Sequence, residues 1–538
     1  MKKKLKYVFL LGALCMAACA TEPEVPVNNP TAMPTQEAVA PEVTKEPEAT
    51  TIPEATKAPE LTDVPKEETI PVRILLESKK IDVWEDGRQL YAVIWQNPLI
   101  GGEDASKYPA ISTVFRSLKT LQDRESESVA ANLAGVAEDL KQYAHEMDVA
   151  CYDSTRYFVQ RADNHIISMR CNLSTDTGGI HPMSFVSGYN FSTETGALLS
   201  LSDVVTDPEQ VRALVKKSLS EKYADCLFDE WESLFAEMET DALSWTLDYE
   251  GLTFYFSPYE LSFYAAGVLT VDIDFAMEPA LFKKAYMAVP EQGSAMALPF
   301  HSYVEIEGTN GTKDTVLVGQ CREEDDEFSF KLEIEKNGKS ILEYPVYAYE
   351  YKAYLVAVEE KDFLFVDAIM DNDYKILYVF DLSQDRITAP VSEMNAGFVT
   401  MPTDAETYSY AEEVFNNPAE IRLSSRVDVF GTMEGTRSYS FDAKSGTLVP
   451  QTDVYTLDET MFPLISKIPL EVTLVGDNTK ATVPAGTEFI FLRTDGNTYA
   501  EFRLPDGREC RVTREGGWPY TVNGVPEEEC FDGIGYAG

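Results

Sequence analysis

The sequence TGGIHP at residues 177–182 and the sequence FYFSPYEL at residues 254–261 are the strongest indications of how this chain folds. The two glycines of the first stretch permit backbone conformations that other residues rarely adopt, and its proline stiffens the exit from the turn. The second stretch reads as a strand that ends in a rigid Ser-Pro-Tyr turn. Rigid turns that carry exposed aromatic side chains have the composition of a binding edge.

Both stretches are therefore candidate ligand contacts. An equally weighted alternative for residues 177–182 is a turn with only a structural role. A structure that places the two stretches in one exposed patch would favour binding. The candidate ligand-contact residues are Gly178, Gly179, His181, Pro182, Pro258, Tyr259 and Glu260.

The surrounding residues 71–290 have the patterning of an α+β domain. One amphipathic helix carries an apolar stripe of Val129, Leu133, Val136 and Leu140. A second helix begins at Thr206 or Asp207, with Pro208 in its first turn. The expected strands are residues 90–95, 156–160, 166–170, 252–256 and 268–273.

The rest of the chain is predicted to be all-β. In residues 291–466 short alternating runs recur between turn residues, and residues 411–417 are the one expected short helix. Residues 467–538 form a small β module in which short strands are joined by glycine-bearing turns. The order of a P-x-G-T turn, a strand and a D-G hairpin in this module resembles bacterial SH3-like wall-associated modules, which implies a small barrel.

A Tyr-x-Phe pattern followed by a turn occurs three times, at residues 189–196, 378–385 and 439–446. Strands with Tyr and Phe on one face that run into such a turn indicate hairpins with a buried aromatic face. This interpretation is favoured over a ligand-binding role for these aromatic residues.

The N-terminus reads as an export signal and an anchor. Residues 1–18 combine a lysine-rich start with a short apolar run, too short to cross a bilayer, before the sequence MAAC. This sequence resembles the bacterial lipobox, which implies lipidation of Cys19, although its first residue is Met where an aliphatic residue is usual. An ordinary cleaved signal is the alternative. Residues 19–70 are rich in Pro, Thr and Glu and form a predicted disordered tether.

Composition limits the class of partner. The chain has 538 residues and a formal net charge of −45, most of which lies after residue 70. A nucleic-acid ligand is excluded because its binding requires a basic surface. With 44% hydrophobic residues the chain can build real cores, and a basic partner outside the cytoplasm suits its charge.

No catalytic or metal-binding motif stands out. The four histidines, His145, His165, His181 and His301, lack helical metal-ligand spacing. Nucleophile-elbow and phosphate-loop motifs are missing from the sequence, and no cofactor is expected. A glycan-acting enzyme with paired carboxylates stays open, because the 90 acidic residues do not single out a pair.

Six cysteines follow the lipidation site. Cys510 and Cys530 are the first candidate disulfide because a small module gains most from a cross-link, and free thiols are the alternative. Cys151 and Cys171 are a weaker second candidate.

The motifs GGxHP, YNF and TG, followed by FxFxPYE and YAAG, resemble the extracytoplasmic domain of RsiV-like proteins over residues 71–290. That family includes a lysozyme-sensing anti-sigma factor, and its domain also stands next to peptidoglycan deacetylase domains. The resemblance implies an α+β fold and binding of lysozyme. The sigma-binding segment and the metal-dependent catalytic domain have no counterpart here, so only the binding function is carried over.

We therefore expect a non-catalytic lipoprotein anchored outside the cytoplasm by its N-terminal lipid. Its partner would be a protein such as lysozyme, or a cell-wall polymer. A wall-glycan enzyme and a structural envelope protein are the alternatives.

Overall fold

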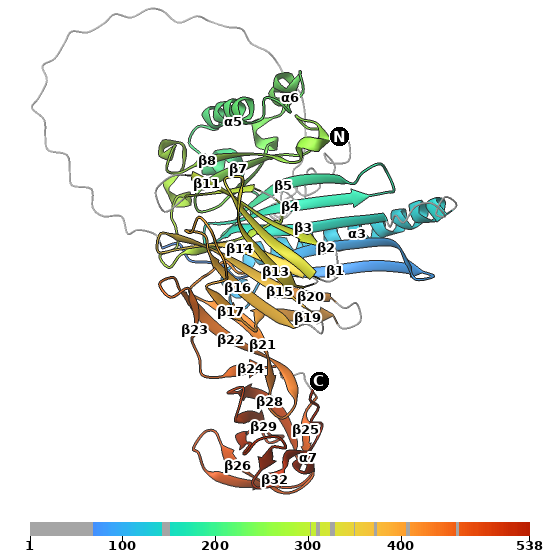
Figure 1. The fold of residues 1–538 in the computed structure, drawn as a ribbon, viewed down its shortest axis with the longest axis vertical. Helices are drawn as coiled ribbons and strands as arrows, with labels where there is room; N and C mark the ends of the chain where they lie inside the picture. The colour runs from blue at the N-terminus through green and yellow to red at the C-terminus, as the bar shows by residue number, and fades with distance from the viewer. Residues whose placement is uncertain are drawn as a thin grey trace, which may run out of the picture. The chain divides into compact units, whose positions relative to one another are not determined.

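The computed structural model describes residues 68–141, 151–301, 303–307, 313–322, 329–348, 350–370, 374–404, 409–458 and 462–537. The chain divides into two units, residues 1–68 and residues 69–538. The expected signal peptide, Cys19 and nearly all of the expected tether lie outside the described residues. In the second unit the longer helices belong to its N-terminal part, and β-strands in several sheets make up the rest (Figure 1).

A seven-stranded sheet is the base of the N-terminal part, with the order β19-β20-β1-β2-β3-β4-β5. Its neighbours are antiparallel except β2 and β3, which run parallel. Its strands are β1 (Ile74–Glu85), β2 (Arg88–Ile100), β3 (Cys151–Ala162), β4 (Ile166–Asp176), β5 (Met183–Ser192), β19 (Thr400–Asp404) and β20 (Ser409–Glu413).

The long helix α3 (Pro109–Lys141), preceded by the short α2 (Asp104–Lys107), packs on this sheet. From Ser126 to Ala137 its buried side chains recur every three or four residues, as an amphipathic helix requires. The predicted stripe is part of this face: Leu133 is buried, and Val129, Val136 and Leu140 are half-buried beside Val93 and Trp95 of β2. The expected first helix is therefore confirmed, although it begins earlier than its stripe indicated.

A second layer holds a three-stranded sheet with β6 (Ser244–Leu247), β7 (Gly251–Phe256) and β8 (Leu269–Asp274). Helices α4 (Leu201–Val204), α5 (Pro208–Lys222) and α6 (Trp231–Glu237) share its hydrophobic core. Asp207 caps α5 by accepting a hydrogen bond from Gln210 N at 3.0 Å, as its sequence predicts. Asn190 of β5 donates to Trp245 O at 2.8 Å and so ties the second layer to the seven-stranded sheet.

The middle of the chain forms two antiparallel sheets around one core, as its alternating pattern predicts. One sheet contains β9 (Ser294–Leu298), β14 (Glu350–Val358), β15 (Lys361–Ile369), β16 (Lys375–Asp381) and β17 (Ser392–Met394). The other contains β10 (Tyr303–Glu307), β11 (Lys313–Arg322), β12 (Ser329–Lys336) and β13 (Lys339–Tyr347).

The C-terminal strands form one large branched sheet and a small hairpin. β24 pairs with both β22 and β28, so this sheet crosses the predicted boundary at residue 466. A closed barrel is not found within the described ranges, and an SH3-like module is therefore not confirmed. The elements are β18 (Gly397–Phe398), β21 (Ile421–Asp428), β22 (Thr432–Asp442), β23 (Thr447–Pro450), β24 (Tyr455–Leu457), β25 (Leu464–Ser466), β26 (Leu470–Leu474), β27 (Lys480–Val483), β28 (Glu488–Thr494), β29 (Tyr499–Arg503), β30 (Glu509–Thr513), β31 (Thr521–Val522), β32 (Val525–Pro526), α7 (Glu527–Cys530) and β33 (Phe531–Asp532).

The short helix expected at residues 411–417 is wrong. Residues 409–413 form strand β20, which pairs antiparallel with the edge of β1 from Leu75 to Ser78. The helical pattern of this segment is local, whereas the open edge of β1 supplies backbone partners only to an extended chain. The N-terminal sheet is therefore completed by residues far along the chain.

The expected disulfides do not form: Cys151, Cys171, Cys510 and Cys530 are all free, buried thiols. Cys530 turns its sulfur toward Val522 O and Val525 O, at 3.9 and 3.7 Å. Cys510 and Cys530 belong to a core that also includes residues before 466, such as Val427 and Leu457. This larger core makes a cross-link less necessary than a separate small module would.

The three Tyr-x-Phe segments have buried phenylalanines, Phe191, Phe380 and Phe441, in agreement with the hairpin interpretation. A fully buried ion pair lies near the first of them. Arg161 Nε is 2.7 Å from Asp163 Oδ2, and the guanidinium also donates to Tyr286 O at 2.6 Å. Both side chains have no exposed surface.

Candidate functional site

The β4–β5 loop contains the predicted GGIHP stretch and is held from both sides. Gly178 N donates to Asp176 Oδ1 at 2.9 Å, and Gly178 has a φ of +76°, in the region that favours glycine. A Cβ atom at Gly178 would lie 2.7 Å from Leu140 Cδ1, so this loop rests on the end of α3. The glycine thus meets both a conformational and a steric requirement.

The turn after β7 contains the predicted Ser-Pro-Tyr stretch and is braced by short-range hydrogen bonds. Ser257 N donates to Glu260 Oε2 at 2.7 Å, and Tyr259 N donates to Ser262 O at 3.0 Å. Ser257 Oγ accepts a hydrogen bond from Val186 N at 3.0 Å. This last contact fixes the turn against strand β5, which begins directly after the GGIHP loop.

Three rings from these two loops stack on one another. The ring centroid of His181 lies 3.8 Å from that of Tyr264 and 6.3 Å from that of Tyr259, with interplanar angles of 19° and 26°. Tyr264 opens a short 3₁₀ turn, η2 (Tyr264–Ala266). We call His181, Tyr259 and Tyr264, with their sequence neighbours Ile180 and Phe263, the aromatic patch; the Phe263 ring itself packs edge to face on Phe228, with the centroids 5.0 Å apart.

The aromatic patch is open to solvent. Ile180 is fully exposed, Phe263 is 56% exposed and Tyr259 is 50% exposed. Single exposed apolar side chains are ordinary, but several of them close together mark binding surfaces, and aromatic residues are enriched where protein partners bind. The patch has the composition of a protein-binding surface.

Both ring nitrogens of His181 have hydrogen-bond partners. His181 Nδ1 lies 3.1 Å from Pro182 O, and His181 Nε2 lies 3.4 Å from Tyr259 Oη. A ring with its proton on Nδ1 donates to the carbonyl oxygen and accepts from the tyrosine hydroxyl, so both contacts are satisfied. The imidazole is therefore held in one orientation within the stack.

Most of the predicted contact residues meet in this one place, although their roles differ. His181 and Tyr259 belong to the patch, while Gly178, Gly179 and Pro182 shape its loop. Pro258 is buried, which disfavours the expected ligand contact for this residue. Glu260 is half-buried and holds the turn through Ser257 N.

Three members of the patch were not among the predicted contacts: Ile180, Phe263 and Tyr264. Ile180 lies inside the GGIHP stretch, and Tyr264 begins the YAAG run that follows the Ser-Pro-Tyr turn. Their position next to the predicted contacts could have pointed to them. Which of these side chains is exposed or stacked, however, depends on the tertiary fold.

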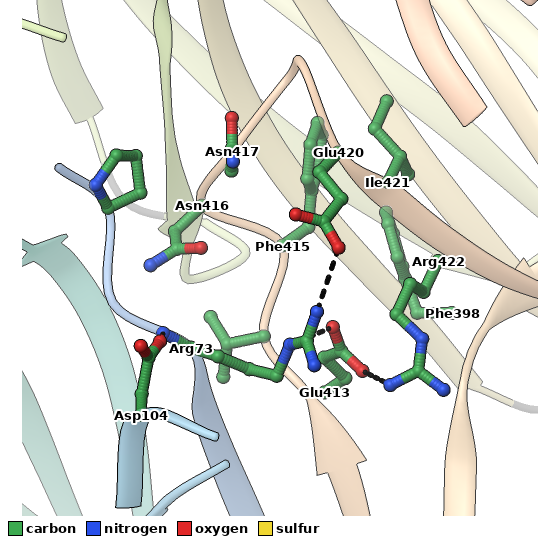
Figure 2. A pocket seen from close by; sticks show the side chains of 12 residues that line it. Arg73, Asp104, Phe398, Glu413, Phe415, Asn416, Asn417, Glu420, Ile421 and Arg422 are labelled. Atoms are coloured by element: carbon green, nitrogen blue, oxygen red, sulfur yellow. Dashed lines mark hydrogen bonds and ion pairs between the residues drawn. The ribbon is translucent and has the colours of Figure 1, made fainter. Parts of the chain in front are cut away.

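A separate polar pocket lies where residues 71–104 meet residues 398–422 (Figure 2). Arg73 Nε lies 3.1 Å from Glu413 Oε1, and Arg422 Nη1 lies 2.9 Å from Glu413 Oε2. Arg73 Nη2 also pairs with Glu420 Oε1 at 3.0 Å. Burial raises the pKa of Glu413, and the two arginines oppose this effect. These ion pairs tie Arg73, directly before β1, to the end of β20 and to β21.

No group of His, Cys, Asp and Glu side chains within the described ranges could hold a metal ion. Likewise, no helix among the described residues is long and apolar enough to span a membrane.

Residues 202–276 match a family model described as a protein of unknown function (DUF3298). This segment includes Tyr259 and Tyr264 of the aromatic patch, whereas His181 lies before it. No curated protein matches the chain.

Solved structures of DUF3298 family members are similar to part of the chain. One from Bacteroides fragilis is 18% identical and aligns over 39% of this chain and 97% of its own, with a TM-score of 0.29. Another from Pseudomonas aeruginosa is 13% identical and aligns over 40% of this chain and 95% of its own, with a TM-score of 0.28.

Proposed function

We propose that this chain is a non-catalytic binding protein, anchored by a lipid outside the cytoplasm, that binds a basic protein such as lysozyme at the aromatic patch. The observation that carries the proposal is the stacking of the exposed Tyr259 with the half-buried His181 and Tyr264. The residues come from two separate loops, and both loops are fixed by internal contacts.

A rigid aromatic surface suits tight binding for a physical reason. Binding normally costs the entropy of ordering side chains and loops. Here the stack, the Gly178–Asp176 hydrogen bond and the Ser257–Val186 hydrogen bond hold the surface in place beforehand. The exposed Ile180 then offers an anchor that a partner's pocket can bury.

Charge supports a basic partner. The net charge of −45 attracts a cationic protein over long range and raises the rate of encounter. This attraction weakens as salt screens the charges, which makes ionic strength a useful variable.

The choice of lysozyme as the partner rests on the sequence resemblance to RsiV-like proteins. The DUF3298 match is consistent with it. The proposed lipid on Cys19 and the tether of residues 19–70 would present the patch away from the membrane.

Calorimetry with the full chain and hen lysozyme, at low and at moderate salt, tests the proposal. We expect binding that weakens with salt, and a loss of at least about tenfold in affinity for Ile180→Ser and for Tyr259→Ala. Met277→Ser is the matched control, because Met277 is 71% exposed and lies outside the patch. Lack of binding at low salt, or equal losses in Ile180→Ser and Met277→Ser, would contradict the proposal.

A further inference from the structure

A second aromatic cluster lies near the C-terminus, in a part of the chain that the proposed function does not use. The ring of Trp518 packs edge to face against Tyr520 and Tyr536, with centroid distances of 6.1 and 5.4 Å. Trp518 is 66% exposed, whereas both tyrosines are half-buried. The two tyrosines thus pack edge to face against a large flat indole that stays mostly in solvent, where tryptophan is rarely found.

An arginine and a glutamate lie beneath these rings. Arg514 Cζ is 3.8 Å from the centroid of the Tyr520 ring, and Arg514 Nε donates to Asn497 O at 2.7 Å. Tyr536 Oη donates to Glu527 Oε1 at 2.7 Å. The positive charge of Arg514 offsets the negative charge of Glu527, so the base of the cluster has no net charge with which to select an ion.

Glu527 leaves one hydrogen-bond acceptor unused. Its side chain is buried, with 2% of the residue exposed, and Glu527 Oε2 has no hydrogen-bond partner. Burial raises the pKa of Glu527, although the hydrogen bond from Tyr536 opposes this effect. A buried polar atom without a partner is costly, so a donor that reaches Oε2, directly or through a water, would be stabilising.

The cluster combines a flat apolar face, a neutral base and an unsatisfied acceptor. We propose that Trp518, Tyr520, Tyr536 and Glu527 form a binding site for a neutral saccharide. The apolar face of a sugar ring would stack on the Trp518 indole, and a sugar hydroxyl would donate to Glu527 Oε2 after a local opening that exposes this buried atom.

The charge of the surroundings argues against the other ligand classes. An anionic polymer or an acidic peptide is repelled by the exposed carboxylates of Glu515, Glu528 and Glu529 and by the net charge of the chain. A cationic group would be attracted by the same carboxylates, but Arg514 already covers the face of Tyr520, which leaves it only the Trp518 ring, and choline tests for it below. A neutral molecule rich in hydroxyl groups meets neither obstacle.

The test measures, by calorimetry, the binding of two soluble saccharides to the full chain. The saccharides are N-acetylglucosamine tetramer and cellotetraose. We expect at least one of them to bind, and Trp518→Ala to weaken that binding at least about tenfold. Trp84→Ala is a matched control, because Trp84 is also a highly exposed tryptophan, at 59%, in the β1–β2 hairpin. Its affinity should equal that of the parent chain.

Glu527→Gln separates stacking from the hydrogen bond, because the amide keeps the size of the carboxylate and loses its second acceptor. It should weaken saccharide binding while its thermal unfolding confirms a folded chain. The proposal is overturned if neither saccharide binds at millimolar concentration, if choline binds in their place, or if Trp518→Ala and Trp84→Ala behave alike. The Tyr259→Ala variant should bind the saccharide normally, so this site and the aromatic patch can fail independently.

Discussion

Tyr259 Oη lies 3.4 Å from His181 Nε2, although 78 residues separate the two along the chain. The contact is made between two loops, so its geometry depends on how firmly each loop is held. The GGIHP loop rests on α3, and the Ser-Pro-Tyr turn is tied to β5. Substitutions that disturb either support should therefore affect the patch without touching its rings.

Gly178→Ala should destabilise the protein and displace the GGIHP loop. Gly178 has a φ of +76°, and its new Cβ would lie 2.7 Å from Leu140 Cδ1. We expect the free energy of unfolding to fall by about 2–3 kcal/mol, from backbone strain and from the clash together. Denaturant unfolding measures the loss.

Gly87→Ala provides the control for backbone strain, because Gly87 has a φ of +79° with open space around it. It should cost only about 1 kcal/mol. Leu140→Ala removes the atom that clashes with the new Cβ. Added to each variant, it should therefore recover part of the lost stability in Gly178→Ala and none in Gly87→Ala. If both glycine variants lose the same free energy of unfolding, the contact with Leu140 does not contribute to the effect.

Arg161→Met should be strongly destabilising, because it leaves Asp163 buried without its partner at 2.7 Å. Breaking one side of a buried ion pair typically costs about 3–5 kcal/mol. Lys217→Met is the comparison, since Lys217 and Glu221 are an exposed pair 3.9 Å apart. That change should cost no more than about 0.5 kcal/mol. Similar losses in the two variants, measured by denaturant unfolding, would mean that the buried pair is not a structural requirement.

Asp123 should make stability depend on pH in the acid range. Burial opposes ionisation, but hydrogen bonds from Lys79, Trp95, Asn97 and Lys119 lower its pKa to about 2 in the folded protein. An unfolded aspartate has a pKa of about 3.9. The stabilisation is therefore complete above about pH 4 and is lost as the pH falls toward 2.

Asp123→Asn should remove this part of the pH dependence. Denaturant unfolding from pH 2 to pH 6 compares the two proteins, and their difference should shrink as the pH falls. A constant difference across this range would show that Asp123 has no depressed pKa in the folded state.

A fragment ending at residue 290 should be less stable than the full chain and should self-associate. It lacks β20, so the edge of β1 from Leu75 to Ser78 loses its backbone partner. It also loses the ion pair of Arg73 with Glu413. Size-exclusion chromatography and amide exchange at residues 75–78 check this expectation. A monomeric fragment with the amide protection of the full chain would contradict it.

Local sequence patterns predicted where helices and strands lie better than they predicted which strands pair with one another. The apolar stripe ending at Leu140 and the Asp207 cap placed two helices correctly, because periodicity and capping are properties of neighbouring residues. Strand β20 was misjudged because its helical pattern yields to the edge of β1, more than 300 residues away.

The same difference between local patterns and long-range packing applies to the candidate site. The sequence marked out the loops of His181 and Tyr259, since glycine and proline reveal turns. It could not show that Pro258 is buried or that Tyr264 stacks on His181, because both facts arise from packing between loops. Nor does the sequence reveal that the exposed Trp518 packs against two tyrosines.

The link between Asn416 and the start of the sheet has a consequence for biosynthesis. Asn416 Nδ2 donates to Val72 O at 2.7 Å across 344 residues. Under the proposed function the chain is exported from its N-terminus, so one edge of strand β1 stays unpaired until residues 409–413 have also emerged. During that interval the nascent edge is open to mispairing with other chains. The N-terminal sheet thus reaches its full seven strands only after residues 400–413 have joined it.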